Sequence, residues 1–225
     1  MTNAFASTIY RMGDHKLLLG AGPEKAVAST KAYIAKISVL TILAYALVNK
    51  LATGKKILRK AAKEIKRLLS KESINQIKNI ASLLAKSDHI YIIGRGVSYA
   101  TALEGALKIK EVSYIHTEGL SGGELKHGTI ALISKGTPVI VIAPLDDTYD
   151  AIISNAIEIK SRGGLMIGIS SENNPAFDIW IQVKETGSPL LTHIIPMQLL
   201  AYYLAVLKKL NPDTPRNLAK SVTVK

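Results

Sequence analysis

The chain has 225 residues, of which 48% are hydrophobic and 20% charged, and its formal net charge is +12. This apolar content is typical of a folded core and excludes a disordered chain. Cysteine is absent, which excludes disulfides, thiolate metal sites and a cysteine nucleophile and fits a cytoplasmic protein.

The first long apolar segment is 32–48, and a second one follows much later at 193–207. Both are shorter than the roughly 20 residues that cross a membrane. The first contains Lys36 and the second contains Pro196 and Gln198. Both are therefore predicted to be buried or interface helices, and no membrane partner is expected.

Residues 50–87 carry most of the positive charge, with eleven Lys or Arg against two Glu. Apolar residues recur at helical spacing through 55–86, which predicts two helices with the basic residues outward. A basic face can attract nucleic acid. No aromatic residue is interleaved for base stacking, so a solvated helix face is the preferred interpretation and nucleic acid is not an expected partner.

Short apolar strands then alternate with helices. The strands are predicted at 89–94, 138–143, 165–169 and 177–183, and the helices at 100–115, 148–161 and 193–209. This alternation predicts an α/β fold, a three-layer α/β/α sandwich around a parallel sheet.

A weak internal repeat indicates that the chain contains more than one copy of this unit. Residues 43–47 (LAYAL) resemble residues 200–204 (LAYYL), and each segment closes an apolar helix. Thr2 and Asn3 occupy the place of Ser170 and Ser171 in the second copy. We therefore expect the chain to begin near the end of a strand, inside a first unit.

Three charged residues stand together on the predicted helix 100–115. Lys108 lies four residues after Glu104 and three before Glu111, so the three share one face. Because the helix is otherwise apolar, one interpretation is a carboxylate tuned as an acid or base beside a lysine. Ordinary ion pairing is the other.

Two further segments carry candidate groups. The loop 121–128 (SGGELKHG) presents His127, either as a capping residue or for proton transfer near neutral pH. The tail 213–225 holds Lys220 among small and apolar residues. A lysine desolvated in a pocket can form a Schiff base with a ketose carbonyl.

Four stretches, in this order, resemble the isomerase half of the glutamine–fructose-6-phosphate aminotransferases, within the phosphosugar-isomerase (SIS) family. They are AGPEKAVASTKAY (21–33), ALEGALKIKEVSYIHTE (102–118), GGELKHG (122–128) and PRNLAKSVTV (215–224). The resemblance implies fructose 6-phosphate and glucosamine 6-phosphate as ligands. No histidine or acid cluster has ligand spacing, so neither a metal nor a redox cofactor is expected.

The resemblance also implies a role for each site residue. Glu111 would move the proton between C1 and C2, and Lys108 would sit by the sugar oxygens. Lys220 would form the Schiff base, and His127 would assist ring opening from the neighbouring subunit of a homodimer. The sugar pocket would be lined by Val27, Ser29 and Ala219.

Two departures from the family pattern bear on activity. The full enzymes begin with a glutaminase domain that uses an amino-terminal cysteine, and their first SIS unit carries Ser/Thr-rich phosphate loops. Neither is present in this chain. We therefore expect a remnant of a first SIS domain (1–54), a complete second one (55–210) and an active-site tail (211–225).

This incomplete pattern leaves several functions open. The preferred one is an enzyme part with little synthase activity alone, covered by a homodimer or completed by a separate chain that supplies the missing half. The alternatives are a stand-alone SIS isomerase or deaminase, and a non-catalytic module that binds sugar phosphates.

Overall fold

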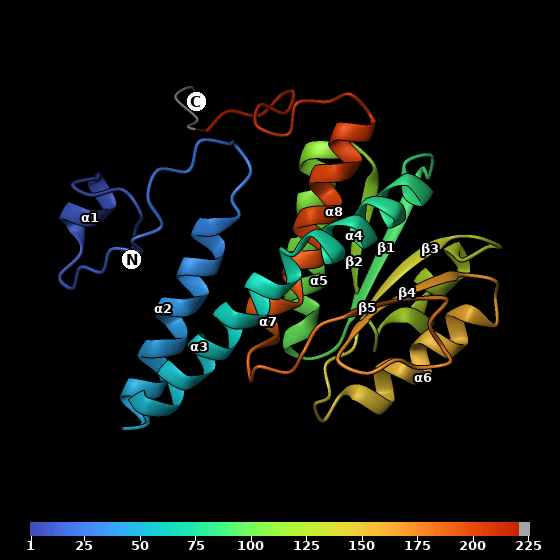
Figure 1. The fold of residues 1–225 in the computed structure, drawn as a ribbon, viewed down its shortest axis with the longest axis horizontal. Helices are drawn as coiled ribbons and strands as arrows, with labels where there is room; N and C mark the ends of the chain where they lie inside the picture. Colours follow the sequence, from blue (N-terminus) through green and yellow to red (C-terminus); the bar gives the residue numbers. More distant parts are fainter. Residues whose placement is uncertain (221–225) are drawn as a thin grey trace.

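A computed structural model describes residues 1–220 and has a five-stranded parallel sheet at its centre (Figure 1). The strand order is β2-β1-β3-β4-β5, and every neighbouring pair is parallel. The strands are β1 (His89–Gly94), β2 (His116–Ser121), β3 (Pro138–Ile142), β4 (Leu165–Ser170) and β5 (Ile179–Gln182). The predicted α/β/α sandwich with a parallel sheet is therefore confirmed.

The three central strands are almost fully buried because their residues are apolar on both sides. Ile90, Ile92 and their neighbours on β3 and β4 face one helical layer, whereas Tyr91 and Ile93 face the other. Strand β2 was not predicted from the sequence. It lies at the edge of the sheet and is mostly half-buried, so it lacks the continuous apolar run of a central strand.

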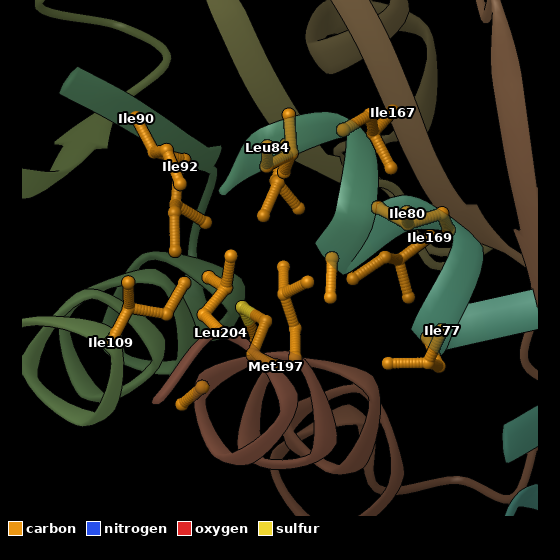
Figure 2. Packing of buried hydrophobic residues seen from close by; sticks show 14 of the residues in the cluster. Ile77, Ile80, Leu84, Ile90, Ile92, Ile109, Ile167, Ile169, Met197 and Leu204 are labelled. Carbon is orange, nitrogen blue, oxygen red and sulfur yellow. The ribbon is translucent and has the colours of Figure 1, made fainter. Parts of the chain in front are cut away.

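One face of the sheet is covered by α4 (Lys71–Leu84), α5 (Val97–Ser113) and α8 (Ile194–Leu207). Figure 2 shows Leu84, Ile109 and Met197 from these three helices converging on the isoleucines of the strands. The other face carries α6 (Tyr149–Lys160) and the short turns η1 (Leu125–His127) and η2 (Thr129–Leu132).

The segment 189–207, comprising α7 (Pro189–Thr192) and α8, is long and apolar enough to cross a membrane. In this fold it is packed inside the protein. Eight residues of α8 are buried, among them Met197 and Leu204, and α8 packs against α5 and α4. The interpretation of this segment as a buried helix is confirmed.

The amino-terminal part lies beside this domain, away from the sheet (Figure 1). It contains α1 (Thr8–Met12) and α2 (Lys31–Leu47), and α3 (Leu51–Leu68) joins it to the rest. Thr2 is bridged to Leu18 in parallel, as Ser170 of β4 pairs with Gln182 of β5. A parallel backbone pairing followed by an apolar helix therefore occurs in both parts of the chain.

Helix α2 has no fully buried residue although it is apolar along its whole length. It packs against α3 and α7, and leaves Leu40, Leu43 and Leu47 exposed by 45%, 37% and 84%. Helix α3 runs across the boundary proposed at residues 54–55, so the division into 1–54, 55–210 and 211–225 stays a prediction. Part of the tail, residues 221–225, lies outside the described residues.

The outer edge of β5 is covered by side chains from α3 and α4. Gln76 Nε2 donates to the Trp180 carbonyl at 2.7 Å, and Arg67 Nη2 donates to the Gln182 carbonyl at 2.6 Å. Glu64, only 5% exposed, accepts from Arg67 and from the backbone N–H of Lys184. These bonds satisfy backbone groups that an edge strand otherwise leaves open.

Candidate active site

Helix α5 brings the charged residues of the candidate site into the interior. It opens at the turn 94–98, where Gly96 has a φ of +52°, and it packs against both the sheet and α8. Close packing with α8 depends on Gly105, because a side chain there would collide with Met197. This contact fixes the rotation of α5 and therefore which residues face the interior.

Lys108 is held between two carboxylates on α5. Its Nζ lies 2.6 Å from Glu111 Oε2 and 3.5 Å from Glu104 Oε1, and its side chain is 5% exposed. Burial raises the pKa of Glu104, and the nearby charge of Glu111 raises it further, while Lys108 opposes both effects. The three residues form a desolvated carboxylate–ammonium–carboxylate row, an arrangement suited to proton transfer.

A cavity of about 160 Å³ lies beside Lys108. Its walls come from α5, α8, the loop before α2 and the start of the tail, through Ala26, Ala28, Thr30, Lys108, Val112, Gln198, Ala201, Tyr202, Pro212 and Asp213. The loop and the tail are joined there, because Val27 N donates to the Asp213 carbonyl at 3.0 Å. Segments far apart in the sequence therefore enclose one small, mostly apolar space.

The loop before α2 is organised by Glu24. Its Oε1 accepts from Thr30 N at 2.6 Å and its Oε2 accepts from Ser29 Oγ at 3.1 Å. Burial alone would raise the pKa of Glu24, but these hydrogen bonds outweigh it and the net shift is downward. The carboxylate is thus kept ionised at the start of α2, where the helix dipole favours negative charge.

The tail returns from α8 across the molecule to this loop (Figure 1). Arg216 N donates to Tyr114 Oη at 2.7 Å, and its guanidinium stacks 4.3 Å from the Tyr114 ring centroid. Lys220 Nζ donates to the carbonyls of Ala26 at 2.7 Å and Val27 at 3.4 Å, and lies 3.9 Å from Glu24. The tail is therefore fastened both to the end of α5 and to the loop.

Most of the residues predicted from the sequence gather around this cavity. Lys108 lines it, and Glu111 is paired with Lys108. Lys220 is bonded to Ala26, another wall residue. Val27 and Ser29 are half-buried in the same loop, and Ala219 is exposed beside Lys220. Of the predicted catalytic residues only Lys108 lines the cavity; Glu111 contacts it through Lys108, and the exposed Lys220 contacts it through the Ala26 carbonyl.

His127 is the exception. It lies exposed in η1, beyond the carboxyl end of β2. Glu111 is in the last turn of α5, which starts at the carboxyl end of β1 and runs back toward the amino ends of the strands. Within one chain, His127 therefore lies near the carboxyl ends of the strands, and Glu111 lies near their amino ends. A role for His127 in a neighbouring subunit's site stays a prediction.

Two side chains near the site were not singled out from the sequence. Glu24 is one, and its only signal was a carboxylate shortly before the Ser29-Thr30 pair that opens a helix. Tyr33 is the other. Burial, reinforced by Glu104, raises its pKa to about 12, and its hydroxyl donates to the Leu190 carbonyl at 3.3 Å. Among residues 1–220 there is no group of three or more metal-ligating side chains.

The sequence of the main domain decides the family. The family model of the SIS domain matches residues 83–208, which are more than half of the chain. The chain belongs to the SIS domain family. The matched SIS segment contains the whole sheet, α5 and α8, and it therefore holds Lys108 and Glu111.

Curated relatives are similar to this chain over its full length, beyond the segment that the SIS domain model matches. Glutamine–fructose-6-phosphate aminotransferase (isomerizing) from Pyrococcus horikoshii is 45% identical over 230 residues, which cover 100% of this chain and 38% of that protein. The enzyme of the same name from Thermococcus kodakarensis is 42% identical and also covers 100% of this chain, with 39% of its own length matched. The chain thus corresponds to the carboxy-terminal isomerase part of these relatives and spans less than half of their length.

Solved structures agree with this SIS assignment. The C-terminal domain of glucosamine-fructose-6-phosphate aminotransferase from Francisella tularensis superposes with a TM-score of 0.82 at 31% identity, covering 94% of this chain and 63% of that one. Glucosamine-6-phosphate deaminase from Thermotoga maritima superposes with a TM-score of 0.72 at 22% identity, covering 96% of this chain and 63% of that one. The second match shows a shared fold.

Proposed function

We propose that this chain is the isomerase part of a glutamine–fructose-6-phosphate aminotransferase and acts in the cytoplasm on fructose 6-phosphate to form glucosamine 6-phosphate. The observation that carries the proposal is the cavity whose wall residues Lys108 and Ala26 are bonded to Glu111 and Lys220, respectively.

The chemistry needs few groups. Once the ring is open, Lys220 condenses with the C2 carbonyl, and nitrogen transferred from an amino donor then takes the place of Lys220 at C2. Glu111 removes a proton from C1 and returns it to C2, so that the sugar gains a C1 aldehyde and a C2 amine. Lys108 lies 2.6 Å from Glu111 and supplies the cation that stabilises the developing oxyanion. His127 assists ring opening from the partner subunit of a homodimer.

The open face of α2 supports an additional partner. Thr2 and Leu18 are joined by a single isolated bridge, and α2 has no buried residue. We assign this face to the strands and phosphate-binding loops of the first SIS unit, carried by the same or a separate polypeptide. Without those loops the sugar phosphate loses the binding energy that positions it, so the chain by itself should form little product.

The test combines this chain with a second chain that carries the preceding part of the P. horikoshii relative. We expect glucosamine 6-phosphate to form from fructose 6-phosphate and an amino donor only in the mixture. Glu111→Gln should lower the rate by about 10² to 10⁴-fold, the range for a lost general base. Glu72→Gln, an exposed glutamate on α4, is the matched control and should leave the rate unchanged.

Other outcomes distinguish the alternatives. Isomerisation of fructose 6-phosphate or deamination of glucosamine 6-phosphate by the chain alone would replace the proposal with a stand-alone isomerase or deaminase. Tight sugar-phosphate binding that Glu111→Gln does not alter, with no turnover in any mixture, would replace it with a binding module.

A further inference from the structure

Two histidines lie side by side at the amino ends of two neighbouring strands, whereas His127 lies beyond the carboxyl end of β2. His89 begins β1 and His116 begins β2, and they are partners in the strand register. Their Nδ1 atoms are 3.0 Å apart, and their rings are perpendicular with centroids 5.2 Å apart. Both side chains are exposed, and the proposed function uses neither.

We propose that His89 and His116 chelate one divalent transition-metal ion of the Cu²⁺ or Ni²⁺ class through their Nδ1 atoms. Imidazole nitrogens bind such ions at about 2.0–2.1 Å, and two nitrogens at that distance and at a right angle are about 2.9–3.0 Å apart. The observed 3.0 Å separation meets this requirement. A tetrahedral angle would need about 3.4 Å, so square-planar or octahedral ions fit better than tetrahedral Zn²⁺.

The surroundings leave room for the remaining ligands. A hollow of about 330 Å³ opens beside His89, and its polar lining includes Asp88, Ser134 and Thr137. Glu118 lies two residues after His116 on β2, opposite Tyr91, whose raised pKa is caused by burial and by the charge of Glu118. The sheet alternation places Glu118 on the same face as His116. Water from the hollow can complete the coordination, and the Glu118 carboxylate adds negative charge on the same face of the sheet.

The sequence hides this pair because 27 residues separate the two histidines, a spacing outside the short metal-binding motifs. Parallel pairing of β1 with β2 brings them together. A bound ion would also tie the edge strand β2 to the buried strand β1. The charged groups that line the hollow are Lys86, Asp88 and Lys135. The two lysines repel a bound metal ion, whereas Asp88 attracts it.

The experiment is a calorimetric titration of the tag-free full chain with Cu²⁺ and separately with Ni²⁺ at pH 7.5. We expect one ion per chain. His89→Asn and His116→Asn should each weaken binding at least about tenfold, because one imidazole alone no longer chelates. His15→Asn changes an exposed histidine elsewhere and should leave the affinity unchanged. Circular dichroism confirms that the variants fold.

Two further measurements locate the site. Protons compete with metal ions for imidazole nitrogens, so binding should be much weaker at pH 5.5 than at pH 7.5. Substoichiometric Cu²⁺ should broaden the amide NMR signals of residues 88–91 and 115–118 before any others. The proposal is overturned if the wild-type chain binds no ion, if His89→Asn binds as tightly as the wild type, or if the broadening centres elsewhere. A hydrogen-bonded histidine pair without metal affinity would give the first result.

Discussion

Helices α2 and α8 have nearly the same kind of sequence but opposite surroundings. Both are apolar along their length, and their ends match in the repeat 43–47 and 200–204. Leu204 is completely buried, whereas Leu47 is 84% exposed. The difference comes from their surroundings, because α8 packs against α5 and α4 in the core cluster that includes the sheet, whereas α2 packs mainly against α3 and α7. An all-apolar helix therefore predicts burial without telling which elements provide it.

The largest expected effect is on stability, when the matched leucines of the two helices are each replaced by alanine. Leu204→Ala should lower the free energy of unfolding by about 2–5 kcal/mol, the range for a buried leucine. Leu47→Ala should change it by less than about 0.5 kcal/mol, as at an exposed position. Urea unfolding of both variants measures this. An equal loss of unfolding free energy in the two variants would mean that α2 is covered in solution by another copy of the chain.

A second test uses the starts of the two helices. Burial lowers the pKa of His193, which precedes α8, to about 4, below its usual value near 6.5. The neutral imidazole thus stabilises the fold above pH 6.5, and this contribution, on the order of 3 kcal/mol, is lost as the pH falls toward 4. Urea unfolding between pH 7 and pH 4 should show the loss.

The control for that titration is His193→Asn, which removes the group. It should flatten the stability profile between pH 6.5 and 4, whatever its effect at pH 7. At α2 the pKa of Glu24 is lowered instead, so its contribution is present above pH 4.5 and disappears only at more acidic pH. A wild-type profile that is flat between pH 6.5 and 4 would contradict the neutral, buried state of His193.

The smallest expected effect compares two helix caps. Ser70 Oγ accepts from Ser73 N at the start of α4, and Ser70→Ala should cost about 1 kcal/mol of global stability. Glu24→Ala removes the acceptor of Thr30 N at α2 and should act locally. Amides at the start of α2 should exchange about fivefold faster, with little change in urea unfolding. Loss of global stability in Glu24→Ala would show that α2 unfolds together with the main domain.

The sequence predicted the central strands and the main helices because their apolar residues follow one clear period. It missed β2, in which Thr117, Glu118 and Gly119 interrupt the apolar pattern. Lys108 and Glu111 could be placed on one face because they share a helix. The cavity could not be predicted, since it depends on contacts such as that of Lys220 with Ala26, 194 residues apart.

The covered edge of β5 also limits how this protein can assemble. The Gln76 and Arg67 side chains already donate to the Trp180 and Gln182 carbonyls, so this edge is a poorer template for hydrogen bonding by a strand of another chain. These contacts thereby protect the β5 edge from pairing with strands of other chains, the process that leads to aggregation. We therefore expect larger complexes of this chain to form through helices and loops, or through the opposite edge of the sheet at β2.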